Sequence, residues 1–377
     1  MVRRINLLFI AFSVLSSSSW AQEIDLKAGT NRALVLRGKT CEEVTTQQKA
    51  ICEWKKIVEP GFEPKNPVTC KTVNGKAQVT ILECLPKFTK DYHLKTLANS
   101  GPNCWGTTMN LKGMSLAPRF MWPEEMEYWI DSPLCRKLSP GEEKKPGDVM
   151  NVYGPEYIFD REINLSDMGT RFWDALYPGR YQEPKGVGYS GYHRLLHSVT
   201  YITDEIAFGK DSPAHDDKFK YHNASEIYGR PSYDRECTEN QNLTPHRREY
   251  DSQPKTIAHS KCAYFSTLHR CERFDDYFGS LPLTDEEKDI FKNVEALQKI
   301  QETLFPLVTT PKTVLPSSAV NLIVTNADLT MKRCQEDLSK KGLSKNREML
   351  LTLEYFTAAA LRKSLEQARI IPATEAL

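Results

Sequence analysis

One cysteine of this chain lies in a context that favours nucleophilic chemistry. Cys104 follows the turn-forming run Gly101-Pro102-Asn103 and precedes a segment that can form a helix. The first turn of a helix stabilises a thiolate, which is the nucleophilic form of cysteine. A catalytic cysteine also needs a histidine, and His197 opens the strand-like run His197-Ser198-Val199-Thr200-Tyr201-Ile202. We therefore predict that Cys104 and His197 act as a nucleophile and its base.

The partner of His197 depends on the length of one loop. After Ile202 the chain turns and returns as a strand-like run over 205–210. A two-residue turn would set His197 opposite Lys210, which cannot accept a proton from imidazole. A three-residue loop would set His197 opposite Asp211, which can orient the ring and stabilise its charged form. We predict the second arrangement, with Asp211 as the third member of the site.

Two segments resemble cofactor-binding motifs but lack a residue that each motif needs. His193 and His197 are four residues apart, but the zinc peptidase motif needs a glutamate after the first histidine, and Arg194 stands there. The β-branched run after His197 also favours a strand. The glycine-rich run 186–191 follows no clear strand and leads to no phosphate-binding lysine. We expect neither a metal nor an organic cofactor.

Three features together suggest a family. Cys104 with its following helix, the turn Pro146-Gly147-Asp148-Val149 and the strand that starts at His197 resemble the NlpC family of papain-like cell-wall cysteine peptidases. The resemblance covers about 101–212 and implies a papain-like core, with a sequence insertion within about 151–191. It also implies that the substrate is the short peptide stem of bacterial peptidoglycan.

The residues around the nucleophile differ from those of the family. The family's Asp-Cys-Ser-Gly is here Asn103-Cys104-Trp105-Gly106. We expect Asn103, Trp105 and Asp148 to contact the substrate. Two other functions stay open. The chain could be a non-catalytic, disulfide-stabilised envelope binding or structural protein in which Cys104 is bridged, or a thiol-dependent acyltransferase on the same fold. The redox state of Cys104 separates the first of these from an enzyme.

The N-terminus predicts export. A basic start over 1–4, an apolar stretch over 5–15 and the small-x-small site Ser19-Trp20-Ala21 form a signal peptide, residues 1–21. We expect a periplasmic or secreted protein. No later run reaches the roughly 20 apolar residues of a membrane span. With 50 Lys plus Arg against 49 Asp plus Glu, the charge balance gives no sign of a nucleic-acid partner.

The ten cysteines all follow residue 21, so in an exported chain they are expected to pair. Cys70 and Cys84 flank the Asn-Gly hairpin 73–76, which predicts a bridge between them, and Cys41 with Cys52 would complete a stapled module. If Cys104 is free, at least one other cysteine must be free too. The remaining candidates leave the pairing open: Cys237, Cys262 and Cys271 with each other, with Cys135 or with Cys334.

The whole chain is predicted to be α+β. A small β-rich, disulfide-stapled module covers 22–95, a papain-like NlpC-type domain with an antiparallel sheet and insertions covers 96–280, and a helical region covers 281–377. Apolar spacing predicts helices over about 284–304, 318–340 and 344–369, the first of them broken at Pro306. These helices offer a surface for a protein partner, beside their structural role.

Overall fold

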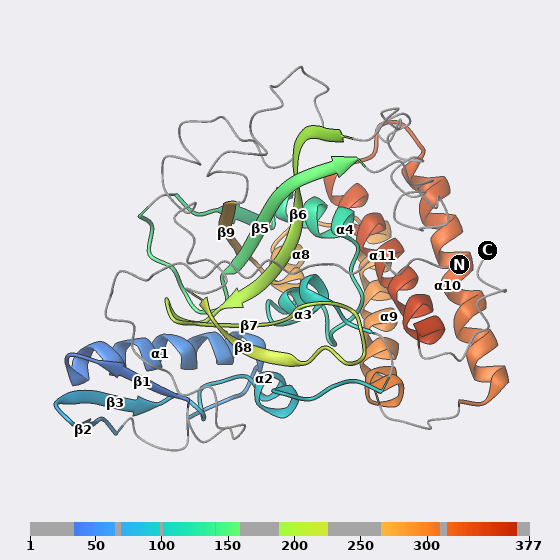
Figure 1. Cartoon of the computed structure of the whole chain (residues 1–377). Helices are drawn as coiled ribbons and strands as arrows, with labels where there is room; N and C mark the ends of the chain where they lie inside the picture. Colours follow the sequence, from blue (N-terminus) through green and yellow to red (C-terminus); the bar gives the residue numbers. More distant parts are fainter. Residues whose placement is uncertain are drawn as a thin grey trace, which may run out of the picture.

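The computed structural model describes residues 34–64, 69–98, 101–139, 141–158, 188–224, 265–309 and 315–367. The predicted signal peptide, Cys237, Cys262 and most of the inserted segment lie outside these residues. Within them the fold is mixed α+β, with antiparallel sheets and a set of C-terminal helices (Figure 1). The predicted fold class is confirmed at this level.

A six-stranded antiparallel sheet forms the centre of the described chain, in the order β4-β9-β5-β6-β7-β8 (Figure 1). Its long central strands, β5 and β6, pair along most of their length. The predicted turn at 145–148 leads into β5, and the strand predicted after His197 is the end of β6. The strands span β4 (Cys135–Lys137), β5 (Val149–Ile158), β6 (Gly188–Tyr201), β7 (Ile206–Lys210), β8 (Phe219–Asn223) and β9 (Phe265–Cys271).

Four short helices lie beside this sheet. The helix predicted after Cys104 is present as α3 (Cys104–Asn110), and it packs against β6 and β7. The others are α2 (Lys87–Tyr92), which contacts β8, α4 (Pro123–Asp131), which contacts β4 and β6, and α8 (Phe274–Gly279). Pro123 occupies the first turn of α4, where a missing backbone N–H costs little.

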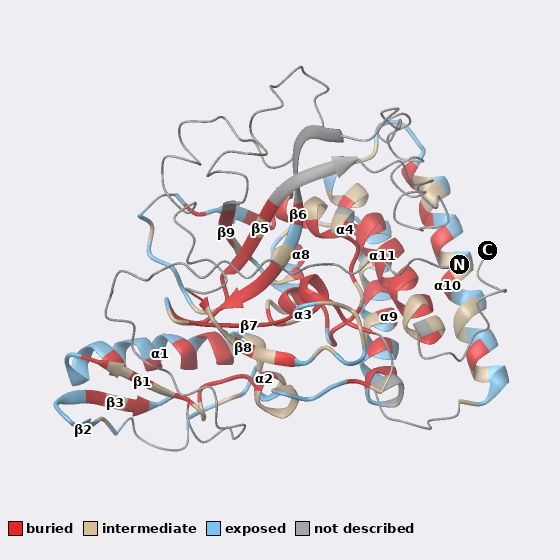
Figure 2. Ribbon diagram, in the orientation of Figure 1, coloured by how far each residue is buried: buried red, intermediate tan, exposed pale blue. Residues whose placement is uncertain are grey.

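Three long helices, α9 (Asp285–Thr309), α10 (Ser317–Leu338) and α11 (Lys345–Gln367), form the C-terminal region. Helix α11 packs against both others and is buried over most of its length, as Figure 2 shows. Leu353, Phe356 and Ala360 have no exposed surface. The three helices were predicted, but the break at Pro306 was wrong, because α9 continues through this proline to Thr309.

The N-terminal module is less β-rich than predicted. Its sheet has the order β1-β3-β2, from β1 (Val35–Gly38), β2 (Lys71–Val73) and β3 (Lys76–Thr80). The predicted hairpin is confirmed, since Asn74 and Gly75 both have positive φ, as a tight Asn-Gly turn requires. An 18-residue helix, α1 (Cys41–Val58), was not predicted. The indole N–H of Trp54 on α1 donates to the carbonyl oxygen of Leu111 at 3.3 Å, tying the module to α3.

Both predicted bridges of this module were wrong. The disulfides are Cys41–Cys70 and Cys52–Cys84. Helix α1 is the reason, because residues 41 and 52 are eleven positions apart on it and therefore about 16 Å apart along its axis. Each cysteine of the helix instead pairs with one from the segments that flank the hairpin.

A third disulfide, Cys135–Cys271, joins β4 to β9 in the central sheet. This pairing was one of several that the sequence left open. Cys104 and Cys334 are both free and buried. The expectation that a free Cys104 implies a second free thiol is therefore met by Cys334.

Candidate active site

Cys104 is the first residue of α3, and Asn103 caps the helix. The side-chain oxygen of Asn103 accepts a hydrogen bond from the backbone N–H of Gly106 at 3.1 Å. Its amide group donates to the carbonyl oxygen of Met121 at 2.7 Å, which joins the helix start to the next segment of chain. Asn103 is only 2% exposed. These contacts give Asn103 a structural role, and its predicted contact with substrate stays a prediction.

Gly106 lets α3 lie directly on another stretch of backbone. A Cβ atom at this position would be 1.7 Å from the carbonyl oxygen of Arg119. Arg119 is itself held by a buried ion pair with Glu125, whose carboxylate it contacts through both terminal nitrogens. The position of the Cys104 thiol thus depends on a glycine two residues later in the chain.

The Cys104 thiol is enclosed, with 4% of the residue exposed. Burial raises the pKa of this thiol to about 12, even though the backbone N–H groups of Ser198, Trp105 and Cys104 itself donate to the sulfur. Ser198 directly follows His197 on β6, and side chains of adjacent strand residues point to opposite faces of the sheet. Among the described residues, no hydrogen bond joins the thiol to the His197 ring. At neutral pH the Cys104 thiol is therefore protonated.

The register of β6 and β7 agrees with the three-residue loop. Ile202 donates its backbone N–H to the carbonyl oxygen of Ile206 at 2.9 Å, and Thr200 pairs with Phe208. Continuing this register puts His197 opposite Asp211. The Nε2 atom of His197 is 4.0 Å from Oδ1 of Asp211. The structure therefore brings these two predicted residues together.

Burial, rather than the charge of Asp211, keeps the imidazole of His197 neutral. Burial lowers the pKa of His197, and Lys220 acts in the same direction, while Asp211 opposes them. For Asp211, burial favours the neutral acid, but the hydrogen bond from Lys220 and the nearby His222 and His197 outweigh it and lower the pKa. At neutral pH the site thus holds a thiol, an uncharged histidine and a carboxylate.

Two further residues near Asp211, Lys220 and His222, were not predicted. Lys220 pairs with Oδ2 of Asp211, and Nε2 of His222 is 3.7 Å from Oδ1. Lys210 is fully buried, donates to the carbonyl oxygens of Ser212 and Ala214, and has a pKa lowered to about 8 by burial. Finding Lys220 and His222 required knowing that β8 pairs with β7, and the polar segment after Ala214 gives no such signal.

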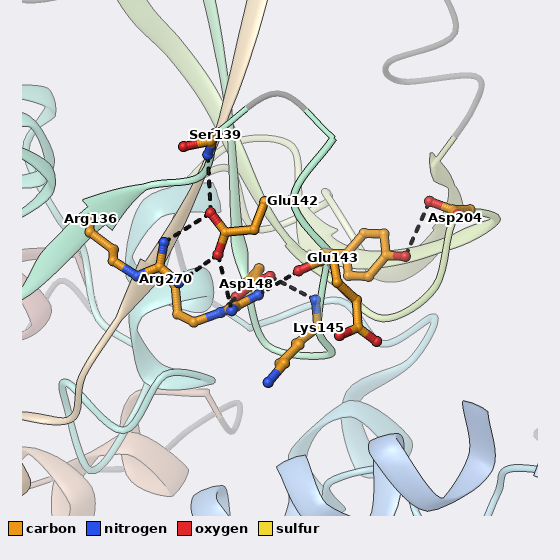
Figure 3. Close-up of polar contacts among 9 residues, drawn as sticks. Arg136, Ser139, Glu142, Glu143, Lys145, Asp148, Asp204 and Arg270 are labelled. Carbon is orange, nitrogen blue, oxygen red and sulfur yellow. Dashed lines mark hydrogen bonds and ion pairs between the residues drawn. The ribbon is translucent and has the colours of Figure 1, made fainter. Parts of the chain in front are cut away.

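Trp105 and Asp148 also have defined places. Trp105 is 9% exposed, and its indole Nε1 has no hydrogen-bond partner among the described residues. Asp148 is 1% exposed and accepts from the Arg270 guanidinium at 2.8 and 2.9 Å and from the backbone N–H of Lys145 at 2.7 Å (Figure 3). Asp148 thus fixes the turn before β5, and substrate contacts of both residues stay predictions.

The described residues contain no group of three or more His, Cys, Asp or Glu side chains suited to hold a metal ion. His193 and His197 both belong to strand β6, in which residues four apart are about 13 Å apart along the strand. In the same part of the chain, none of the helices is both long and apolar enough to cross a membrane.

Comparison with known proteins gives no relative for this chain. No family model, no curated protein and no solved structure matches it.

Proposed function

We propose that this chain is an exported cysteine hydrolase that cleaves the peptide stems of bacterial peptidoglycan. Two observations support the proposal: a free thiol at the start of a helix that packs against β6, and a histidine on that strand close to a carboxylate. The Cys104 sulfur accepts a hydrogen bond from the backbone of Ser198, next to His197, and His197 faces Asp211 at 4.0 Å. A nucleophile, a base and an orienting carboxylate are the parts that thiol-dependent hydrolysis needs.

The chemistry starts from neutral groups. Since burial keeps the thiol protonated and the imidazole uncharged, His197 takes the thiol proton as the sulfur attacks the peptide carbonyl. Asp211 lies on the Nε2 side of the ring, which leaves Nδ1 to receive that proton. Backbone N–H groups that now face the sulfur, those of Cys104 and Trp105, are in place to stabilise the oxyanion. His197 then protonates the leaving amine.

Different observations support the proposed substrate and the proposed location. Peptidoglycan stems are what the resemblance around Cys104, the turn at Asp148 and His197 implies. Three disulfides are compatible with an exported protein, because such bonds persist in oxidising compartments. A periplasmic or secreted location is part of the proposal.

One observation favours a second candidate, a non-catalytic envelope binding or structural protein. Cys104 is 4% exposed, so substrate reaches its sulfur only if the surrounding side chains move. A binding protein in which Cys104 forms a disulfide has less support, because Cys104 is free. A thiol-dependent acyltransferase would use the same three residues and differ only in the acceptor, an amine in place of water.

The test is digestion of purified peptidoglycan by the parent chain, by Cys104→Ala and by Cys334→Ala, with soluble fragments identified by mass spectrometry. Cys334 is the matched control, because it is also a free, buried thiol but lies on α10. The proposal expects peptide fragments from the parent and Cys334→Ala, and none from Cys104→Ala. Equal release by all three proteins, or release by none, would overturn it. Fragments carrying a new amide would identify an acyltransferase.

A further inference from the structure

The carboxylate of Asp211 faces two histidines from different strands. Its Oδ1 atom is 4.0 Å from Nε2 of His197 on β6 and 3.7 Å from Nε2 of His222 on β8. Its Oδ2 atom pairs with the ammonium group of Lys220, also on β8. Lys220 and His222 are two positions apart on this strand, so both side chains lie on the same face of the sheet.

His222 is the more buried of the two histidines. Its side chain is 9% exposed, against 20% for His197. The buried Nε2 atom of His222 has no hydrogen-bond partner in the described part of the chain, although a carboxylate oxygen lies close by. A buried ring nitrogen without a partner costs stability. This arrangement therefore calls for a role that a structural residue would not need.

We propose that His222 is a positioning residue of the cysteine hydrolase and that it competes with His197 for Asp211. The inference rests on the proposed function. While His222 is neutral, Oδ1 is available to hold the ring of His197. When His222 takes a proton from solvent, its Nε2–H becomes a charged donor to Oδ1, and His197 loses its orienting partner. Protonation of His222 thus makes His197 a less effective base.

The surrounding charges set the pH at which this happens. Burial lowers the pKa of His222 to about 4, Lys220 and His197 act in the same direction, and Asp211 opposes them. Lys210 on β7 and Cys104 on α3 also interact electrostatically with Asp211. At neutral pH the competition is off, and it sets in as the pH falls towards 4.

The test follows the ring resonances of His197 and His222 by NMR during an acid titration of the full chain. In the parent, His197 should respond in two steps, the second at the midpoint of His222. In His222→Gln, the second step should disappear. Asp211→Asn, a substitution at a half-exposed residue that does not endanger the fold, should remove it as well. If His197 titrates identically in the parent and either variant, the proposal is wrong.

Activity gives an independent reading. If both histidines must be neutral, the logarithm of kcat/KM should rise with pH with a slope of about two in acid for the parent and about one for His222→Gln. Equal slopes would contradict the proposal. If the chain shows no peptidoglycan hydrolysis at all, the proposed function fails, and the NMR titration still decides whether His222 and His197 share Asp211.

Discussion

Replacing Gly106 by alanine is expected to displace the helix that carries Cys104. The added Cβ would lie 1.7 Å from the carbonyl oxygen of Arg119 and 2.8 Å from its carbonyl carbon. An ordinary contact between carbon and oxygen is about 3.2 Å or more, so the two backbones must separate by about 1.5 Å. The backbone at Arg119 cannot move freely, because the Arg119 side chain forms a buried ion pair with Glu125.

Forcing extra atoms into a well-packed interior typically costs about 1–3 kcal/mol, and contacts that cannot relax cost more. We expect Gly106→Ala to lower the free energy of unfolding by at least about 3 kcal/mol. The matched control is Gly279→Ala, at the exposed end of α8, where a Cβ would meet no atom within 4 Å. That change should be neutral or stabilise by up to about 1 kcal/mol.

The assay is urea unfolding of both variants and the parent, followed by tryptophan fluorescence. The reasoning predicts a clearly lower midpoint for Gly106→Ala alone, together with loss of any peptidoglycan hydrolysis, because the thiol moves with its helix. If Gly106→Ala unfolds at the same urea concentration as Gly279→Ala, the close approach of α3 to Arg119 is not as described.

Three further predictions follow from the same contacts. Because the pKa of His197 lies below 6.5 and that of the Cys104 thiol is about 12, kcat/KM should rise to a plateau with a midpoint below pH 6.5; a fall on the alkaline side near pH 8 would indicate a thiolate–imidazolium pair instead. Glu125→Ala leaves Arg119 buried without its partner and should cost about 3–5 kcal/mol in urea unfolding; a loss below about 1 kcal/mol would contradict this. Replacing Cys52 and Cys84 by serine removes a bridge with a 32-residue separation and should lower the free energy of unfolding by about 3–4 kcal/mol. An unchanged unfolding midpoint of this variant would argue against the bridge.

Local signals predicted the local structure well. Asn74-Gly75 defines a tight turn by its own backbone preferences, and apolar spacing located the three C-terminal helices. Only two residues could lie opposite His197, because the length of the loop between the two strands sets their register. The three-residue loop is held by Thr203, whose hydroxyl accepts from the backbone N–H of Glu205 and of Ile206. Thr203 is the sequence feature that favours the three-residue loop.

The predicted disulfide pairings were wrong because helix α1 was not predicted. Thr40 and Glu43 form the start signal of α1, in which Thr40 accepts from the backbone N–H of Glu43 at 3.2 Å and Glu43 accepts from that of Lys39 at 2.9 Å. Recognising that signal would have separated Cys41 from Cys52 and excluded their bridge.

The surroundings of the site could not be predicted from the sequence. His222 and Lys220 reach Asp211 only because β8 pairs with β7, and the burial of the Cys104 thiol depends on where α3 lies against β6. Both contacts join segments that are far apart in the chain, and neither carries a sequence signal that predicts the pairing. The approach of His197 to Asp211 was predictable from the strand register, whereas the raised pKa of the Cys104 thiol was not.

The most direct test of the central claim is to look for the acyl-enzyme on Cys104. The chain is mixed with purified peptidoglycan stem peptides, stopped with acid within the first turnovers and analysed by mass spectrometry after proteolysis. We expect a thioester adduct on the peptide that contains Cys104, absent from His197→Ala and never found on Cys334. Hydrolysis that continues in Cys104→Ala without any adduct would show that this thiol is not the nucleophile.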